Sequence, residues 1–272
     1  RGCIMYNYEN QEYLQHLTGK SALWYQDVLE ALLSVQPKEV LELGCGDGGF
    51  SRLMAEQKIR VLALDHSKTF LEYARRRTKS RLVQYEQANL DSAVGLHIAG
   101  RRFDAVVSVD VIEHLRRKER LLKDVAGVLE ENGYLVLQVP NLYCNMISQN
   151  YVHSPINLLR KFRRGVRGAW RQFRHKPPED ICRVEYGLDY RVADHDAVWL
   201  SSPFWYLDFF RRHNWELVSC TTWSFDTKKV WLKRILRLAG HLPLLRWLGG
   251  RMIIIARYRG KQPRPRKKRA EH

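Results

Sequence analysis

Two kinds of segment alternate along the first half of the chain. Short apolar, β-prone runs occur at 40–43, 59–64, 82–88 and 103–110, and residues with apolar positions at helical spacing lie between most of them. Because strands joined by helices pair in parallel through right-handed crossovers, this order predicts an α/β protein with a parallel sheet. The continuous apolar character of 103–110 is typical of a buried parallel strand.

The same spacing predicts the remaining elements. Ser67 can cap a helix through its side-chain oxygen, and Asn132-Gly133 is a turn before a fifth strand. Residues 141–195 interrupt the alternation and are predicted to be an insertion. Helices are predicted over 9–35 (with a break near Gly19), 50–57, 67–77, 116–129 and 202–212, and strands over 134–139, 215–224 and 251–258.

A glycine-rich turn, Gly44-Cys45-Gly46-Asp47-Gly48-Gly49, follows the first strand and opens a helix. Glycine allows positive φ and close approach of a ligand, and a helix start offers free N–H donors. Asp65 ends the second strand, 19 residues after Gly46. In doubly wound sheets an acid at this place accepts hydrogen bonds from ribose hydroxyls. A glycine turn alone could be an ordinary β–α connection, but together with Asp65 it predicts a nucleoside-containing ligand.

Glu42, the GxGxGG turn and Asp65 resemble the first motifs of class I S-adenosylmethionine-dependent methyltransferases. The type is the small-molecule one, similar to the methyltransferases of ubiquinone biosynthesis, and the resemblance continues to Pro140. It implies a Rossmann-like, seven-stranded, mostly parallel sheet with helices on both faces, an inserted helical segment and a final antiparallel pair of strands. It also implies methyltransferase activity with S-adenosyl-L-methionine as the cofactor.

The resemblance places the cofactor along the carboxyl edge of the sheet. His66 would lie against the adenine, although an exposed loop histidine is the alternative. Asn89 stands where the family commonly has an acid, and its carbonyl oxygen can still accept a bond from the adenine amino group. The cofactor-binding residues expected on this basis are Glu42, Gly44, Cys45, Gly46, Asp65, His66, Asn89, Leu90 and Asp110.

The pair Glu113-His114 after the fourth strand resembles the fourth motif of small-molecule methyltransferases. Methyl transfer needs alignment of the acceptor and, for some acceptors, removal of a proton. His114 is the candidate catalytic base, with Glu113 beside it, because an unperturbed histidine titrates near pH 6.5. A helix-capping or backbone-bonding role is the alternative. Small-RNA 2′-O-methyltransferases bind metal through a similar segment, for which His195 would complete the set with Asp110; the metal-free arrangement is favoured, and no metal site is predicted.

The net charge of +17 is unevenly distributed. Residues 155–176 carry eight Lys/Arg and residues 227–270 carry fifteen, neither with an acid, which leaves 23 basic against 29 acidic residues elsewhere. The core is therefore mildly acidic, which makes nucleic acid a less favoured partner. Segment 228–248 has Trp and Leu on one side and Lys/Arg on the other, as a helix in a membrane interface does, or as a helix packed on the body with a solvated basic side.

Other sequence features predict the cellular setting. The five cysteines are scattered without CxxC spacing, which suits a reducing compartment, and no apolar run reaches the roughly 18 residues of a membrane span. A cytoplasmic protein, peripheral at the membrane face, is expected. The predicted organisation is an N-terminal helical lid (1–36), an S-adenosylmethionine-binding core (37–140), a basic insertion on the acceptor side (141–195), the C-terminal part of the fold (196–259) and a basic disordered tail (260–272).

The expected function is methylation of a small acceptor, lipophilic, lipid-linked or a glycan precursor, at or near an anionic membrane surface. Two alternatives are open. One is an RNA methyltransferase of the 2′-O type, with or without a metal. The other is a non-catalytic, membrane-docking protein that keeps the methyltransferase fold.

Overall fold

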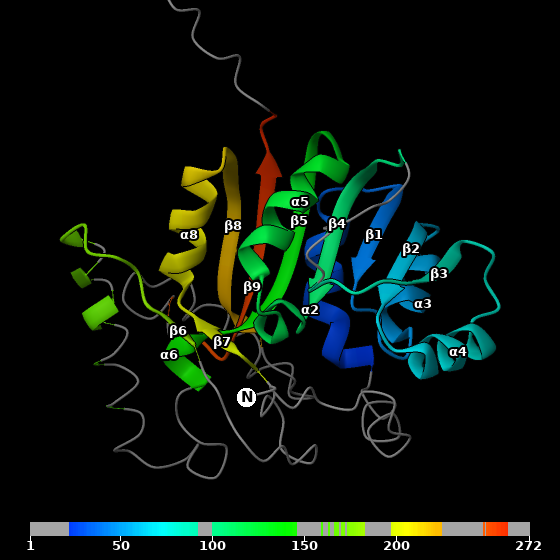
Figure 1. Cartoon of the computed structure of the whole chain (residues 1–272), viewed down its shortest axis with the longest axis horizontal. Helices are drawn as coiled ribbons and strands as arrows, with labels where there is room; N and C mark the ends of the chain where they lie inside the picture. The colour runs from blue at the N-terminus through cyan, green and yellow to red at the C-terminus, as the bar shows by residue number, and fades with distance from the viewer. Residues whose placement is uncertain are drawn as a thin grey trace, which may run out of the picture.

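The computed structural model describes residues 22–91, 100–145, 173–182, 197–224 and 249–260, with Trp247 and seven positions between 159 and 171. A seven-stranded sheet forms the centre of the molecule (Figure 1). Its strands are β1 Glu39–Leu43, β2 Arg60–Asp65, β3 Val83–Gln87, β4 Phe103–Val109, β5 Leu129–Pro140, β8 Trp215–Ser224 and β9 Arg251–Tyr258.

The strand order in this sheet is β3-β2-β1-β4-β5-β9-β8. The first five strands pair in parallel, and β9 runs antiparallel to both β5 and β8. The mostly parallel, seven-stranded sheet with a final antiparallel pair is therefore confirmed. Because β9 is antiparallel, its first residue, Arg251, lies at the same edge as the carboxyl ends of the parallel strands and pairs with Pro140.

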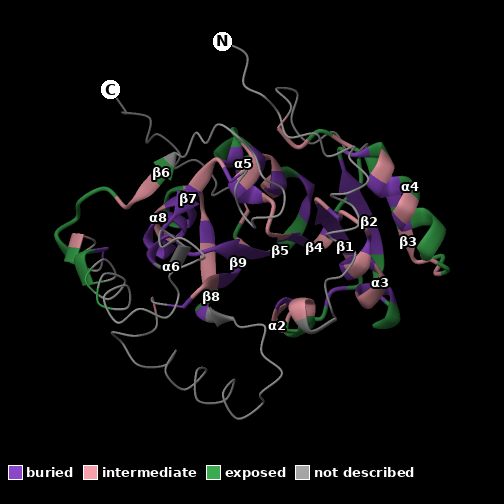
Figure 2. Ribbon diagram, turned by 90° about the horizontal axis from the view of Figure 1, so that it is seen from below, coloured by how far each residue is buried: buried purple, intermediate pink, exposed green. Residues whose placement is uncertain are grey.

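Helices cover both faces of the sheet, as Figure 2 shows. On one face, apolar residues of α5 and α8, such as Leu122 and Phe209, belong to one buried cluster that also contains Leu41 and Leu43 of β1. On the other, residues of α2 and α3 pack against the alternate positions of the same strands. The helices are α2 Ala22–Leu33, α3 Gly49–Glu56, α4 Lys68–Arg77, the 3-10 turn η1 Ile112–His114, α5 Lys118–Val128, α6 Leu142–Asn145 and α8 Pro203–Arg212.

Several predicted elements are confirmed almost to the residue. Strands β8 and β9 have the predicted bounds. Helix α4 begins after the expected cap, because Ser67 accepts from the Phe70 N–H at 3.2 Å. Helix α8 also begins close to its predicted start, and there Ser202 accepts from the Trp205 N–H at 3.2 Å. These local signals were sufficient because each cap is formed within three residues of the chain.

Three elements differ from the prediction. Strand β5 begins at Leu129 rather than at 134, because Leu129 already pairs with Phe103 and residues 130–133 bulge out before Tyr134 resumes the register. Helix α5 is shorter than 116–129, and η1 precedes it. Strands β6 Asp180–Cys182 and β7 Trp199–Ser201 form a separate antiparallel pair that the sequence did not predict.

The segment 228–248 lies outside the described residues except for Trp247, as do His195 and the tail from Lys261. Within the part of the chain that the structure describes, none of the helices combines the length and the apolar character needed to cross a bilayer.

Candidate cofactor and active site

The glycine turn has the backbone conformation that its composition predicted. Gly44, Gly46 and Gly48 have φ angles of 75°, 52° and 73°. A Cβ at Gly44 would overlap the methyl groups of Val111, so this position must be glycine on steric grounds as well. A Cβ at Gly46 would meet nothing within 4 Å. The backbone at Gly46 therefore faces open space, as a turn that receives a ligand requires.

The Asp65 carboxylate fixes this turn. Its Oδ2 accepts from the Gly46 N–H at 2.8 Å, and its Oδ1 accepts from the Ser67 N–H at 2.9 Å. The residue is buried, so these two bonds set its orientation. Each carboxylate oxygen has a second lone pair, and Asp65 can therefore still accept bonds from two vicinal hydroxyls. The prediction that Gly46 and Asp65 belong to one site is consistent with this direct bond.

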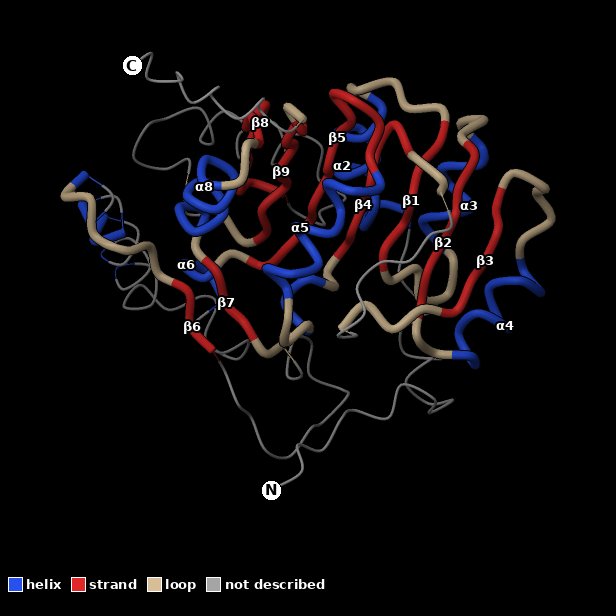
Figure 3. The backbone as a smooth tube through the Cα atoms, turned by 45° about the horizontal axis from the view of Figure 1, so that its top comes forward, coloured by secondary structure: helices blue, strands red, loops and turns tan. Residues whose placement is uncertain are grey.

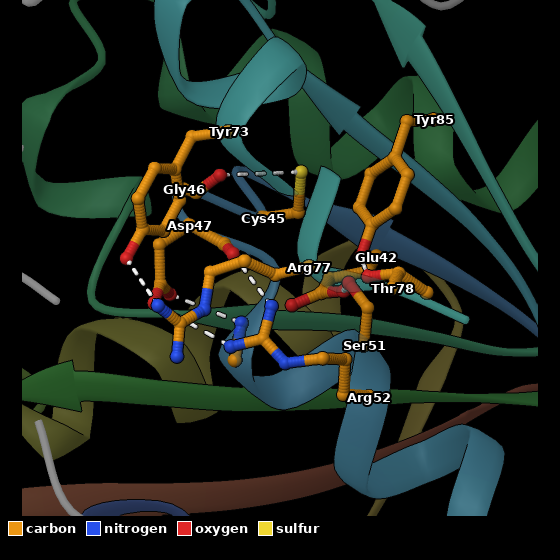
Figure 4. Close-up of polar contacts among 11 residues, drawn as sticks. Glu42, Cys45, Gly46, Asp47, Ser51, Arg52, Tyr73, Arg77, Thr78 and Tyr85 are labelled. Carbon is orange, nitrogen blue, oxygen red and sulfur yellow. Dashed lines mark hydrogen bonds and ion pairs between the residues drawn. The ribbon is translucent and has the colours of Figure 1, made fainter. Parts of the chain in front are cut away.

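A buried polar network supports the glycine turn from the interior side, and Figure 4 shows its members next to one another. Ser51, on α3, donates its hydroxyl to Glu42 of β1. The Tyr85 hydroxyl lies 2.9 Å from Thr78 Oγ1, and a Cβ at Gly48 would overlap it. Burial raises the pKa of Glu42 from 4.5 to about 8, against the lowering effect of the Ser51 bond. Glu42 therefore supports the glycine turn from inside the protein, through its hydrogen bond with Ser51 of α3.

The other predicted cofactor residues lie near this edge with different exposures. The Cys45 side chain is buried, and burial raises the pKa of its thiol. His66 is exposed, with Nδ1 3.5 Å from Asp65 Oδ1. Asn89 is exposed and its Oδ1 accepts from the Asp91 N–H at 3.0 Å. Leu90 is partly buried against the apolar cluster on the α5 side.

Asp110, after β4, belongs to a cluster of residues from several elements. Its φ is 52°, and its Oδ2 accepts from Gln138 Nε2 at 3.2 Å and lies 3.9 Å from Arg251 Nε. The Arg251 guanidinium lies 3.4 Å from the centroid of the Trp24 ring. Asp110 thus links the end of β4 to the start of β9, and Arg251 in turn contacts α2.

Tyr25, also on α2, reaches the glycine turn. Its ring stacks on Phe50 with centroids 5.3 Å apart, and Cε2 lies 3.3 Å from where a Cβ of Gly49 would be. Burial, followed by the nearby Asp47 and Glu42 carboxylates, raises the pKa of the Tyr25 hydroxyl. The sequence pattern alone assigns no residue of this helix to the site. That the start of β9 and this face of α2 contribute to the site can be recognised only when the order of the strands in the sheet is known.

Glu113 and His114 lie in η1, where the chain leaves β4. Glu113 is buried, and His114 Nε2 lies 3.9 Å from Glu113 Oε1 with 20% of the His114 side chain exposed. The Glu113 carbonyl accepts from the Val198 N–H at 2.8 Å, which ties η1 to the residue before β7. In Figure 3, the loops after β2 and β3 lie on the same side of the sheet as β6 and β7. The β6–β7 pair thus lies at the edge that carries the site.

The alternative set of metal ligands, which needs His195, cannot be formed from the described residues. His195 is outside the described ranges, and among the described residues no group of three or more His, Cys, Asp or Glu side chains could hold a metal ion.

Comparison with known proteins identifies the family of this domain. Residues 41–137 match a family model described as "Methyltransferase domain". A probable S-adenosylmethionine-dependent methyltransferase of Mycobacterium tuberculosis is 36% identical over 104 residues, which are 38% of this chain and 36% of the relative. Demethylmenaquinone methyltransferase of Thermotoga maritima is 29% identical over 121 residues, 44% of this chain and 51% of the relative. The chain therefore spans about half, or less, of the length of these relatives.

The fold is also that of solved structures. An S-adenosylmethionine-dependent methyltransferase of Mesorhizobium loti superposes with a TM-score of 0.54 over 84% of this chain and 96% of the other, at 20% identity. The resemblance stated from the motifs is confirmed, since residues 41–137 match a methyltransferase domain, a relative of this region is named an S-adenosylmethionine-dependent methyltransferase, and the chain has the fold of such enzymes.

Proposed function

We propose that this chain transfers a methyl group from S-adenosyl-L-methionine to a small acceptor that is lipophilic, lipid-linked or a glycan precursor, at or near a membrane surface. The bond from the Gly46 N–H to Asp65 carries the proposal, because it holds a carboxylate that could accept from ribose hydroxyls against a turn whose Gly46 faces open space. When bound, the cofactor supplies an electrophilic methyl group on a sulfonium.

Residues along the carboxyl edge of the sheet would each have a separate role in binding or catalysis. Asp65 would accept from the ribose hydroxyls, and Asn89 from the adenine amino group. Asp110, held by Gln138 and close to Arg251, would face the end of the site nearest β5. His114 would take a proton from an acceptor hydroxyl, and Glu113 would orient its ring.

The lipophilic acceptor is supported by relatives and by charge. The relative from Thermotoga maritima methylates a menaquinone precursor by name, and enzymes named for ubiquinone biosynthesis O-methylation match 126 residues at 25% identity. Half of the basic residues, 23 of 46, lie in the two segments 155–176 and 227–270, and the rest of the chain is mildly acidic. Such a distribution favours contact of the appendages with an anionic surface over nucleic acid held at the catalytic edge.

Donor binding is tested by titration calorimetry with S-adenosylmethionine and its demethylated product. Asp65→Ala should weaken binding by about a hundredfold, because two bonds to a charged acceptor are lost. Asp47→Ala is the matched control, since it removes another carboxylate of the same turn, one that bonds the Gly49 N–H at 3.0 Å. Absence of donor binding by the native chain would refute the enzymatic proposal.

The acceptor class is tested with donor carrying a labelled methyl group. The purified chain is incubated in parallel with a lipid extract, a water-soluble metabolite extract and total RNA. Label in the organic phase supports a lipophilic acceptor, and label in the soluble fraction points to a water-soluble one. Label in RNA would contradict the proposed acceptor and favour the RNA alternative.

A further inference from the structure

An apolar stripe lies on the surface of the insertion. Its four side chains are 59% exposed at Leu159, 43% at Val166, 58% at Trp170 and 75% at Phe173. All four positions are helical. Their spacing of seven, four and three residues places them on one side of a helix. The apolar side of this segment therefore faces outward, where a helix that only covers a core would have polar residues.

The opposite side of the segment explains this orientation. Gly168 is buried, and a Cβ there would overlap the hydroxyl of Tyr143, itself buried on α6. At 100° per residue, Gly168 lies opposite the stripe. The segment thus contacts the body through a glycine, and the stripe points away from it. In Figure 2 the described positions of this segment lie at the edge of the molecule and are largely exposed.

Arginines flank the apolar stripe. Arg163, Arg167 and Arg174 are exposed, and the Arg174 guanidinium lies 5.7 Å from the Trp170 ring centroid. The Trp170 and Phe173 rings stack with centroids 5.8 Å apart. Residues 155–176 carry eight Lys/Arg and no acid. Exposed aromatic and aliphatic side chains with one sign of charge beside them complement an anionic bilayer interface.

The alternatives fit this surface less well. RNA would pair with the arginines and could stack on Trp170, but it offers no contact that buries Leu159 and Val166. A protein groove would bury the stripe but does not require charge of a single sign. The interface of an anionic bilayer accommodates both the apolar stripe and the arginines, because apolar side chains enter the acyl boundary while arginines stay at the phosphates.

We propose that the apolar stripe and its flanking arginines dock the protein on an anionic lipid surface. This surface differs from segment 228–248, which the sequence analysis singled out for the same role. The inference deepens the proposed function and rests on it for its purpose, because α6, which supports the stripe, follows directly after the carboxyl end of β5. The docking itself is measured without methyl transfer.

The test is flotation of the full chain with phosphatidylcholine vesicles, with and without phosphatidylglycerol. Trp170→Ser combined with Phe173→Ser should weaken binding to the anionic vesicles by about tenfold to a hundredfold, since two large apolar side chains no longer enter the interface. Arg167→Gln should weaken it by about fivefold. Val166→Asp should also weaken it, whereas Val218→Asp is the matched control, because Val218 is 45% exposed on β8.

Each outcome decides a separate point. Phosphatidylglycerol-dependent flotation that is lost in the stripe variants and kept in Val218→Asp supports the docking surface. No flotation, or flotation that the stripe variants leave unchanged, overturns it, as does salt-sensitive RNA binding by the stripe in place of vesicle binding. Donor affinity is measured on every variant as a folding control. If the donor binds and vesicles do not, this inference and the membrane location fail while the proposed methyl transfer stands; if vesicles bind and the donor does not, the proposed enzyme fails.

Discussion

At the residue scale, Glu42 shows how burial sets the ionisation of one carboxyl group. The folded state holds its proton up to a pKa of about 8, whereas the unfolded chain releases it near the ordinary 4.5. Between these values the folded state binds more protons than the unfolded one, so the free energy of unfolding falls as the pH rises. The polar network behind the glycine turn thus makes stability depend on pH.

We expect Glu42→Gln to remove this dependence. The amide oxygen can still accept from Ser51, but glutamine does not titrate, so the native chain should lose about 3 kcal/mol relative to the variant between about pH 5 and about pH 8. Urea unfolding at the two pH values measures the difference. Glu86→Gln, at an exposed position of β3, should behave like the native chain. Parallel loss in native protein and Glu42→Gln would show that another group is responsible.

His114 is tested by a separate substitution at this scale. Its ring is partly exposed beside the buried Glu113, as a base with an orienting carboxylate would be. His114→Ala should lower turnover by about a hundredfold or more and leave donor affinity unchanged. Single-turnover kinetics with the identified acceptor, together with calorimetry, separates these quantities. His213→Ala, at the C-terminal cap of α8, is the control, and near-native turnover of His114→Ala would exclude the base role.

At the scale of elements, what the sequence could predict depended on how local each signal was. The serine caps of α4 and α8 directly precede these helices in the sequence, and β9 is a mostly apolar run. Strands β6 and β7 have three residues each and pair across 16 intervening positions, so neither has a pattern of its own. Gly46 and Asp65 were placed together by spacing, but Trp24, Tyr25 and Arg251 join the site only through the order of strands and helices.

A buried lysine fixes the unpredicted pair of strands. Lys118, at the start of α5, is 2% exposed, and its Nζ donates to Asp180 Oδ1 at 2.7 Å and to Ser201 Oγ at 2.6 Å. The same Nζ lies 4.0 Å from the Trp205 ring centroid and 4.6 Å from that of Trp199. One cation thereby joins β6, β7 and α8 to the core.

Lys118→Met should therefore loosen this pair of strands and cost about 3 kcal/mol, because Asp180 would keep a charge without its cation. Urea unfolding measures the cost, and hydrogen exchange should rise at 180–182 and 199–201. Combining Lys118→Met with Asp180→Asn should recover part of the stability. Lys123→Met, at an exposed position of the same helix, should have little effect. A double variant no more stable than the single one would mean that lost packing is the cause.

At the scale of the whole molecule, positive charge is unevenly distributed along the chain. Half of the basic residues, 23 of 46, lie in 155–176 and 227–270, and two of these, Arg251 and Arg257, belong to strand β9 of the central sheet. The residues just after β9 are hydrogen-bonded to the residue just before β8. Asn214 donates to the Gly260 carbonyl, and the Arg259 N–H donates to the Asn214 carbonyl at 3.2 Å. These bonds lie at the end of β9 opposite Arg251, so Gly260 is separated from the sheet edge that carries the site.

Truncation after Gly260 tests this separation. It removes six Lys/Arg and one acid, so we expect weaker binding to anionic vesicles and a smaller dependence on salt, since each basic residue near the surface contributes about 1 kcal/mol and is screened by ions. Donor affinity and the melting temperature should stay unchanged. Flotation at two salt concentrations, with a full-length variant whose six basic tail residues are glutamine, measures the effect. If truncation and neutralisation both leave the salt dependence intact, the charge that binds lipid lies in 155–176 or 227–259 instead.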